Sequence, residues 1–88
     1  MRGAHRPLTE VIRESAAMAR LTAETARLHK EPEEAARFEQ IAAEAEDRAQ
    51  HLDEIARMGT APGGRLEIQL VAEHEAAVEE LERLSRRL

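Results

Sequence analysis

The chain has 88 residues, of which 42% are hydrophobic, and it carries a net charge of -5. This length suits one compact soluble domain that spans residues 1–88. The absence of cysteine excludes a disulfide framework, a thiolate metal site and a cysteine nucleophile. The acidic balance and the single aromatic residue, Phe38, argue against nucleic acid, and no apolar run approaches the roughly 18 residues of a membrane span. We therefore expect a cytoplasmic protein without nucleic-acid or membrane partners.

Proline and glycine divide the chain into three segments with helical periodicity. The first helix is expected over about 7–30, because Pro7 suits a first helical position and Pro32 disfavours a helical residue before it. The second is expected over about 32–58 and ends at Gly59, which permits a left-handed cap. The third covers about 65–87, after the turn at 59–64. Short connections favour antiparallel neighbours, so the sequence predicts an all-α, up-down-up three-helix bundle that a second chain could complete.

Each segment has one broad apolar face, which predicts the core. In the first segment the face contains Leu8, Val11, Ile12, Ser15, Met18, Ala19, Leu21, Thr22 and Leu28. In the second it contains Phe38, Ile41, Ala42, Ala45, Ala49, Leu52, Ile55 and Ala56, and in the third Leu66, Leu70, Val71, Ala77, Val78, Leu81, Leu84 and Leu88. Because 17 residues are alanine, this core is thin, and a single core of this size contributes only about 3–5 kcal/mol. We therefore expect the chain to self-associate.

Alanine recurs every seven residues along the second segment, at Ala35, Ala42, Ala49 and Ala56. Side chains this small allow another helix backbone to come close. Two interpretations follow from the spacing: simple packing inside the core, or an interface seam between two chains.

Three polar residues lie on the apolar faces, one in each segment: Glu14, Arg48 and His74. Folding the helices about the two turns places Glu14 opposite Arg48 and Arg48 opposite His74, with Leu21 opposite Ile41. A charge on a core face is costly unless it is paired, so the three residues are expected to form one structural polar layer. The alternatives are that Arg48 reaches outward to Glu44 while His74 lies at the edge of the core, or that the residues form a functional site.

The stretch from Glu31 through Met58, which contains most of the segment FEQIAAEAEDRAQHLDEIARMG at residues 38–59, resembles the second helix of ferritin-like proteins, in particular the rubrerythrin-like and encapsulated-ferritin branches. In that family the helix carries Glu-x-x-His, whose two ligands bind iron together with an acid from the first helix. Aligned without gaps, the Glu and His positions are occupied by Ala45 and Arg48. The resemblance therefore implies a ferritin-like fold from which both ligands of this helix are missing.

These observations favour a non-enzymatic protein that works through self-association or through a protein partner, without a cofactor. No nucleophile has a matching base, and no glycine-rich loop is placed to bind phosphate. One alternative is a ferritin-like iron-binding subunit whose site forms across an oligomer interface from Glu14, Glu44 and His74. Another is a phosphotransfer bundle with His74 as the acceptor, which would require an exposed imidazole.

Overall fold

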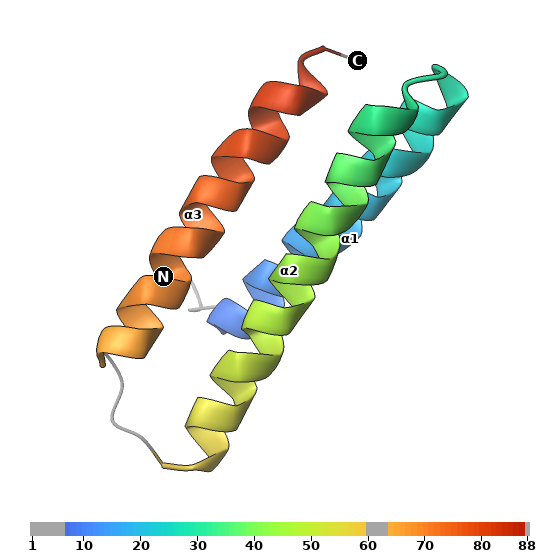
Figure 1. Cartoon of the computed structure of the whole chain (residues 1–88). Helices are drawn as coiled ribbons and strands as arrows, with labels where there is room; N and C mark the ends of the chain where they lie inside the picture. Colours follow the sequence, from blue (N-terminus) through green and yellow to red (C-terminus); the bar gives the residue numbers. More distant parts are fainter. Residues whose placement is uncertain (1–6, 60–63, 88) are drawn as a thin grey trace, which may run out of the picture.

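The computed structural model describes residues 7–59 and 64–87, and it confirms an all-α, up-down-up architecture (Figure 1). Helix α1 spans Leu8–Leu28, α2 spans Pro32–Arg57 and α3 spans Arg65–Ser85. These bounds differ from the predicted ones by at most two residues, because the last residues before each turn leave the helix. Among the described residues, no helix combines the length and the apolar character needed to cross a membrane.

The turn between α1 and α2 is a Schellman motif. The N–H of Glu31 donates to the carbonyl of Ala26 at 2.8 Å, and the N–H of Lys30 donates to the carbonyl of Arg27 at 3.0 Å. Lys30 adopts a φ of 60°, in the left-handed region that usually selects glycine. After α2, Gly59 adopts a φ of 71°, as its predicted capping role requires. The rest of the predicted second turn, residues 60–63, and the expected core residue Leu88 lie outside the described residues.

Helices α1 and α2 pack against each other mainly through alanine. The buried residues of α1 are Ile12, Ala16, Ala19, Ala23 and Ala26, and those of α2 include Ala35, Phe38, Ala42, Ala45, Ala49 and Leu52. On both helices they alternate at spacings of three and four residues, which is the pattern of a heptad seam. Because alanine allows helix axes to approach to about 8 Å, the two backbones lie close together along the seam.

The predicted core face of α1 is right for Ile12, which is fully buried, but wrong for Met18, Leu21 and Leu28. Met18, Leu21 and Leu28 are 56%, 59% and 84% exposed, whereas Ala16, Ala23 and Ala26 are buried. The physical reason is that the alanine stripe and the stripe of larger residues lie on different sides of α1. Close approach to α2 uses the alanine stripe, and this turns the larger residues outward.

A ladder of ion pairs fixes the register of α1 against α2. Arg13 contacts Asp53 at 2.5 Å, Arg20 contacts Glu46, and Arg27 contacts Glu39. The arginines follow one another at seven-residue intervals, so the pairs form along one edge of the helix hairpin. Exposed pairs of this kind contribute about 0.2–1 kcal/mol each. The ladder sets a register one helical turn away from the predicted one, because it places Glu14 level with Leu52 instead of Arg48.

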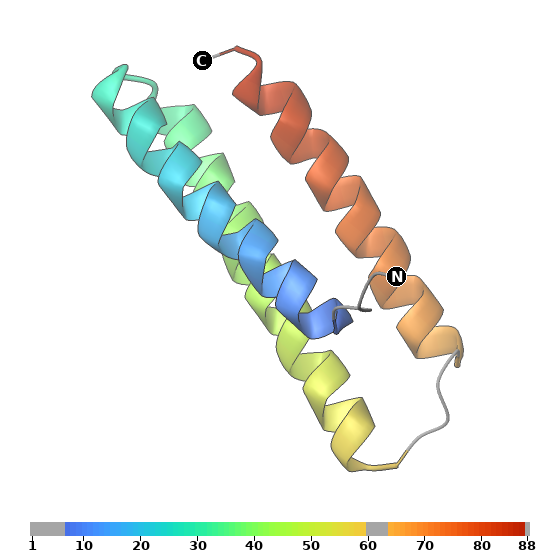
Figure 2. The same cartoon turned by 180° about the vertical axis from the view of Figure 1, so that it is seen from behind.

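Helix α3 is attached more loosely than the other two. α1 and α2 run side by side in both views, while α3 stands farther from them (Figures 1 and 2). Only Leu70, His74 and Leu81 of α3 are buried, and Leu66 and Ile68, near its first turn, are more than half exposed. The structure therefore consists of a tight α1/α2 hairpin with a third helix packed on it through a few side chains.

Candidate functional site

Arg48 of α2 and His74 of α3 are brought together where the two helices meet. Each is only 8% exposed, although both are polar. The Nε and Nη2 atoms of Arg48 and the Nδ1 atom of His74 are buried without a hydrogen-bond partner. In the part of the chain that the structure describes, no carboxylate lies within ion-pair distance of Arg48. The expected neighbours are thus present, but the charge of Arg48 has no balancing group in contact with it.

The environment of His74 favours the neutral imidazole. Burial lowers the pKa of His74 from its ordinary value of 6.5, and the positive charge of Arg48 lowers this pKa further. Glu75 acts on the same pKa in the opposite direction and more weakly. A neutral imidazole beside a guanidinium avoids the repulsion of two buried cations.

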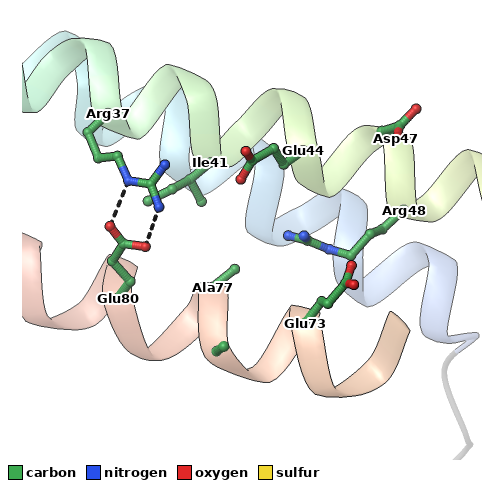
Figure 3. A pocket seen from close by; sticks show the side chains of 9 residues that line it. Arg37, Ile41, Glu44, Asp47, Arg48, Glu73, Ala77 and Glu80 are labelled. Carbon is green, nitrogen blue, oxygen red and sulfur yellow. Dashed lines mark hydrogen bonds and ion pairs between the residues drawn. The ribbon is translucent and has the colours of Figure 1, made fainter. Parts of the chain in front are cut away.

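A groove of about 470 Å³ lies between α2 and α3 beside Arg48. The guanidinium of Arg48 extends along this groove toward Glu44, and Glu73 and Ala77 line it from α3 (Figure 3). Four of the residues that line it are acidic: Glu44, Asp47, Glu73 and Glu80. Because acids outnumber the two arginines of the groove, its charge does not favour an anionic ligand.

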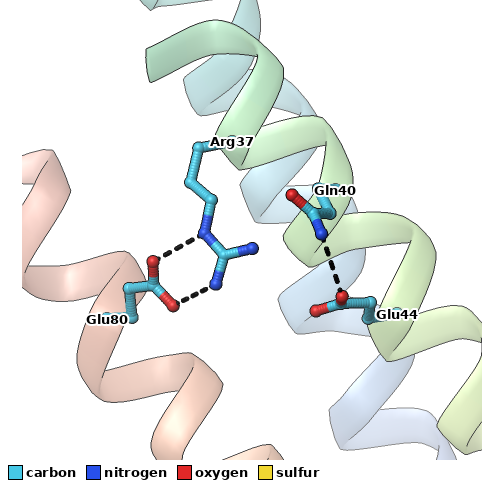
Figure 4. A network of polar contacts seen from close by, with 4 residues as sticks. All are labelled: Arg37, Gln40, Glu44 and Glu80. Atoms are coloured by element: carbon cyan, nitrogen blue, oxygen red, sulfur yellow. Dashed lines mark hydrogen bonds and ion pairs between the residues drawn. The ribbon is translucent and has the colours of Figure 1, made fainter. Parts of the chain in front are cut away.

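Arg37 and Glu80 bridge α2 and α3 at the other end of this groove. Nε and Nη2 of Arg37 donate to the two carboxylate oxygens of Glu80 at 2.6 and 2.5 Å, while Gln40 donates to Glu44 at 3.3 Å nearby (Figure 4). The hydrogen bonds from Arg37 hold the pKa of Glu80 below its usual range. This two-point geometry makes the pair the most specific polar contact between α2 and α3 in the described residues.

Glu14 lies apart from Arg48 and His74. Its side chain is exposed and lines a different groove, between α1 and α3, together with Met18, Val78 and Arg86. The predicted layer of three polar residues therefore reduces to Arg48 and His74. The reason is the register of α1 on α2, which differs by one turn from the expected one and carries Glu14 past the level of Arg48.

The alanines of the predicted seam occupy two environments. Ala35, Ala42 and Ala49 are at most 3% exposed and pack inside the chain against α1, whereas Ala56 is exposed near the end of α2. Of the two interpretations left open by the spacing, packing inside the core accounts for the first three alanines.

The iron alternative needs ligands from more than one chain. Within the described ranges, no three carboxylate or imidazole side chains come together as a set that could hold a metal ion. Glu44 lines the groove between α2 and α3, while Glu14 lines the groove between α1 and α3. A site formed from Glu14, Glu44 and His74 across two copies stays a prediction, which metal analysis of protein purified without chelator would test.

The feature that sequence reasoning missed is an exposed apolar stripe on α1, formed by Val11, Met18, Leu21 and Leu28. Val11 is half-buried and the other three are more than half exposed. In the sequence their spacing predicts a core face, which the structure contradicts for the three exposed residues. The signal that could have separated the two stripes is the second set of positions on α1, at which alanine recurs with heptad spacing.

No protein-family model, no curated protein and no solved structure matches this chain.

Proposed function

We propose that this chain is a non-enzymatic helical protein that works by self-association. The supporting observation is the distribution of side-chain size between core and surface. Among the described residues, eight of the 14 buried hydrophobic ones are alanine, while six large hydrophobic residues are between 51% and 84% exposed. A monomer would thus bury its small apolar side chains and leave much of its larger apolar surface in water.

The free energy available from covering these residues supports the proposal. Fully burying a leucine or methionine side chain contributes about 1.5–3 kcal/mol, and alanine contributes much less. In the isolated chain that contribution is largely unused at Met18, Leu21 and Leu28. Association through this surface would supply the apolar burial that the alanine core lacks.

Sedimentation equilibrium or multi-angle light scattering on the purified chain tests the proposal. We expect a concentration-dependent dimer or higher oligomer in the low micromolar range, accompanied by a rise in the melting temperature with protein concentration, because association stabilises the folded chain. A folded protein that stays strictly monomeric up to about 1 mM would refute the proposal, because its dissociation constant would then lie above that concentration.

A further inference from the structure

The apolar stripe of α1 has a spacing that makes it complementary to itself in one orientation. Val11, Met18, Leu21 and Leu28 are arranged so that the gap of seven residues before Met18 equals the gap after Leu21. Reversing the helix therefore places Val11 on Leu28 and Met18 on Leu21. We propose that α1 pairs with α1 of a second copy of this chain in an antiparallel, two-fold symmetric interface, an inference that rests on the self-association proposed above.

The stripe lies outside the alanine seam that packs on α2, and its residues Val11 and Met18 border the groove between α1 and α3. The alanine seam and the arginine ladder occupy the sides of α1 that meet α2. Seen from behind, α1 lies in front of α2, with α3 to one side (Figure 2). Leu21 and Leu28 are 59% and 84% exposed, and Met18, which borders the groove toward α3, is 56% exposed, so a second helix can contact all three side chains.

Charge distinguishes the antiparallel orientation from the parallel one. Between Val11 and Met18 the stripe passes over Glu14, and between Leu21 and Leu28 it passes over the neutral Thr25. A parallel pair would place Glu14 against the same carboxylate of the second copy, and like charges in this position repel. The antiparallel pair places Glu14 against Thr25 instead.

The ends of the helix favour the same orientation. Antiparallel pairing brings Glu10, in the first turn of α1, to the end of the second copy that carries His29 and Lys30. It also places the positive end of one helix dipole beside the negative end of the other. A parallel pair would align like ends. In the antiparallel pair, apolar groups of one copy thus contact apolar groups of the other, and acidic groups lie beside basic ones. A two-fold interface requires a surface that is complementary to itself in this way.

Charged substitutions at the central contact test both the interface and its orientation. Met18→Glu and Leu21→Lys should each weaken the dimer by about 30-fold or more, as expected for a central interface residue. In an equimolar mixture, the antiparallel heterodimer has one Glu–Lys contact and one native Met–Leu contact. We therefore expect the mixture to regain most of the lost affinity as a heterodimer, which native mass spectrometry identifies by mass. Ile68→Lys, at an exposed position on α3, is the matched control and should leave the dimer unchanged.

The outcomes separate this inference from the proposal on which it rests. A wild-type chain that is monomeric refutes self-association itself. A dimer that resists both Met18→Glu and Leu21→Lys keeps self-association but places it on another surface. Single variants that dissociate, with a mixture that does not recover, overturn the antiparallel orientation. Circular dichroism of each variant shows whether helix content is retained.

A cross-linking experiment gives a second answer in case a charged variant does not fold. The chain contains no cysteine, so introduced thiols report only on designed positions. In the antiparallel pair, the two copies of residue 28 lie about 25 Å apart at 1.5 Å per residue, while residue 28 is adjacent to residue 11 of the other copy. Mild oxidation should therefore cross-link a mixture of Val11→Cys and Leu28→Cys but not Leu28→Cys alone. Efficient cross-linking of Leu28→Cys alone would contradict the antiparallel arrangement.

Discussion

Arg48 is buried without an ion pair in the described residues, although Glu44, Asp47 and Glu73 line the groove beside it. Its Nε and Nη2 atoms are buried without partners, and its positive charge lowers the pKa of His74 on α3. The sequence predicts that Glu14 lies opposite Arg48 and is paired with its charge. Arg48 is instead a buried cation whose desolvation cost is not offset by an ion pair. Its side chain therefore contributes to stability through the packing of its aliphatic part.

Replacing Arg48 with methionine should therefore stabilise the chain. Methionine retains much of the aliphatic volume and removes the unpaired charge, and such exchanges stabilise by about 1 kcal/mol or more when the buried charge is poorly compensated. The free energy of unfolding from urea denaturation measures the effect. Arg57→Met, at an exposed position on the same helix, should change it by less than about 0.5 kcal/mol. A loss of about 3 kcal/mol in Arg48→Met would instead mean that Arg48 has a strong partner.

His74 should make the stability of the chain depend on pH. Its pKa is lowered in the folded chain by burial and by Arg48, so the unfolded chain binds a proton more readily. The free energy of unfolding should be largest above the ordinary pKa of 6.5 and decrease as the pH falls below it. Urea denaturation between about pH 7.5 and pH 5.5 isolates this effect, since Glu46 and Glu80 have lowered pKa values and titrate at more acidic pH.

A pair of histidine variants assigns the pH dependence to this residue. His74→Gln should flatten the curve over that range, whereas His51→Gln, at an exposed position on α2, should leave it unchanged. The same slope in wild type and in His74→Gln would show that another group is responsible.

At the level of helices, the sequence was sufficient to predict where α1 and α2 begin and end, because proline and glycine act on the backbone locally. Pro7, Pro32 and Gly59 set the ends of α1 and α2 through backbone geometry alone, and each end was predicted to within two residues. The orientation of α1 was not predictable in this way. Its larger residues carry the stronger hydrophobic signal, but which stripe is buried depends on how closely α2 approaches, and this is a property of two helices together.

The candidate site was predicted in part for a related reason. The register differs by about one turn from the predicted one and separates Glu14 from Arg48, as the three ion pairs between α1 and α2 show. Arg48 and His74 are still neighbours, since the charge of Arg48 acts on the pKa of His74. Glu14, by contrast, is not level with Arg48, because the register of α1 on α2 differs from the predicted one.

The alanine seam between α1 and α2 should tolerate little added volume. Ala42 is fully buried, and the next residue along the chain, Ala43, is exposed. Ala42→Leu should force the two helices apart and lower the free energy of unfolding by about 1–3 kcal/mol or more. Ala43→Leu adds the same side chain to the same helix outside the seam, so it should change stability by less than about 0.5 kcal/mol. Equal effects of the two variants in urea denaturation would show that α1 and α2 are not closely packed at Ala42.

For the molecule as a whole, the uneven packing implies that α3 opens more easily than the α1/α2 hairpin. α3 buries three residues, whereas α1 and α2 share a continuous core along most of their length. Regions with few buried apolar contacts open at a lower free energy than the global unfolding reaction. Amide hydrogens in the middle of α3 should therefore exchange with solvent faster than those of Ala19, Ala23 and Ala45, as measured by NMR-detected hydrogen exchange.

The Arg37–Glu80 pair gives this prediction a specific control. It joins α2 to α3 through two hydrogen bonds and takes no part in the contacts between α1 and α2. Because the side chains are 37% and 25% exposed, the pair should contribute only about 1 kcal/mol. Arg37→Gln should thus accelerate exchange in α3 by about fivefold and leave the hairpin amides unchanged. Arg20→Gln breaks a pair within the hairpin and should not accelerate α3, because α3 contributes no residue to that pair. Uniform exchange rates across all three helices in every variant would show that the chain opens as a single cooperative unit.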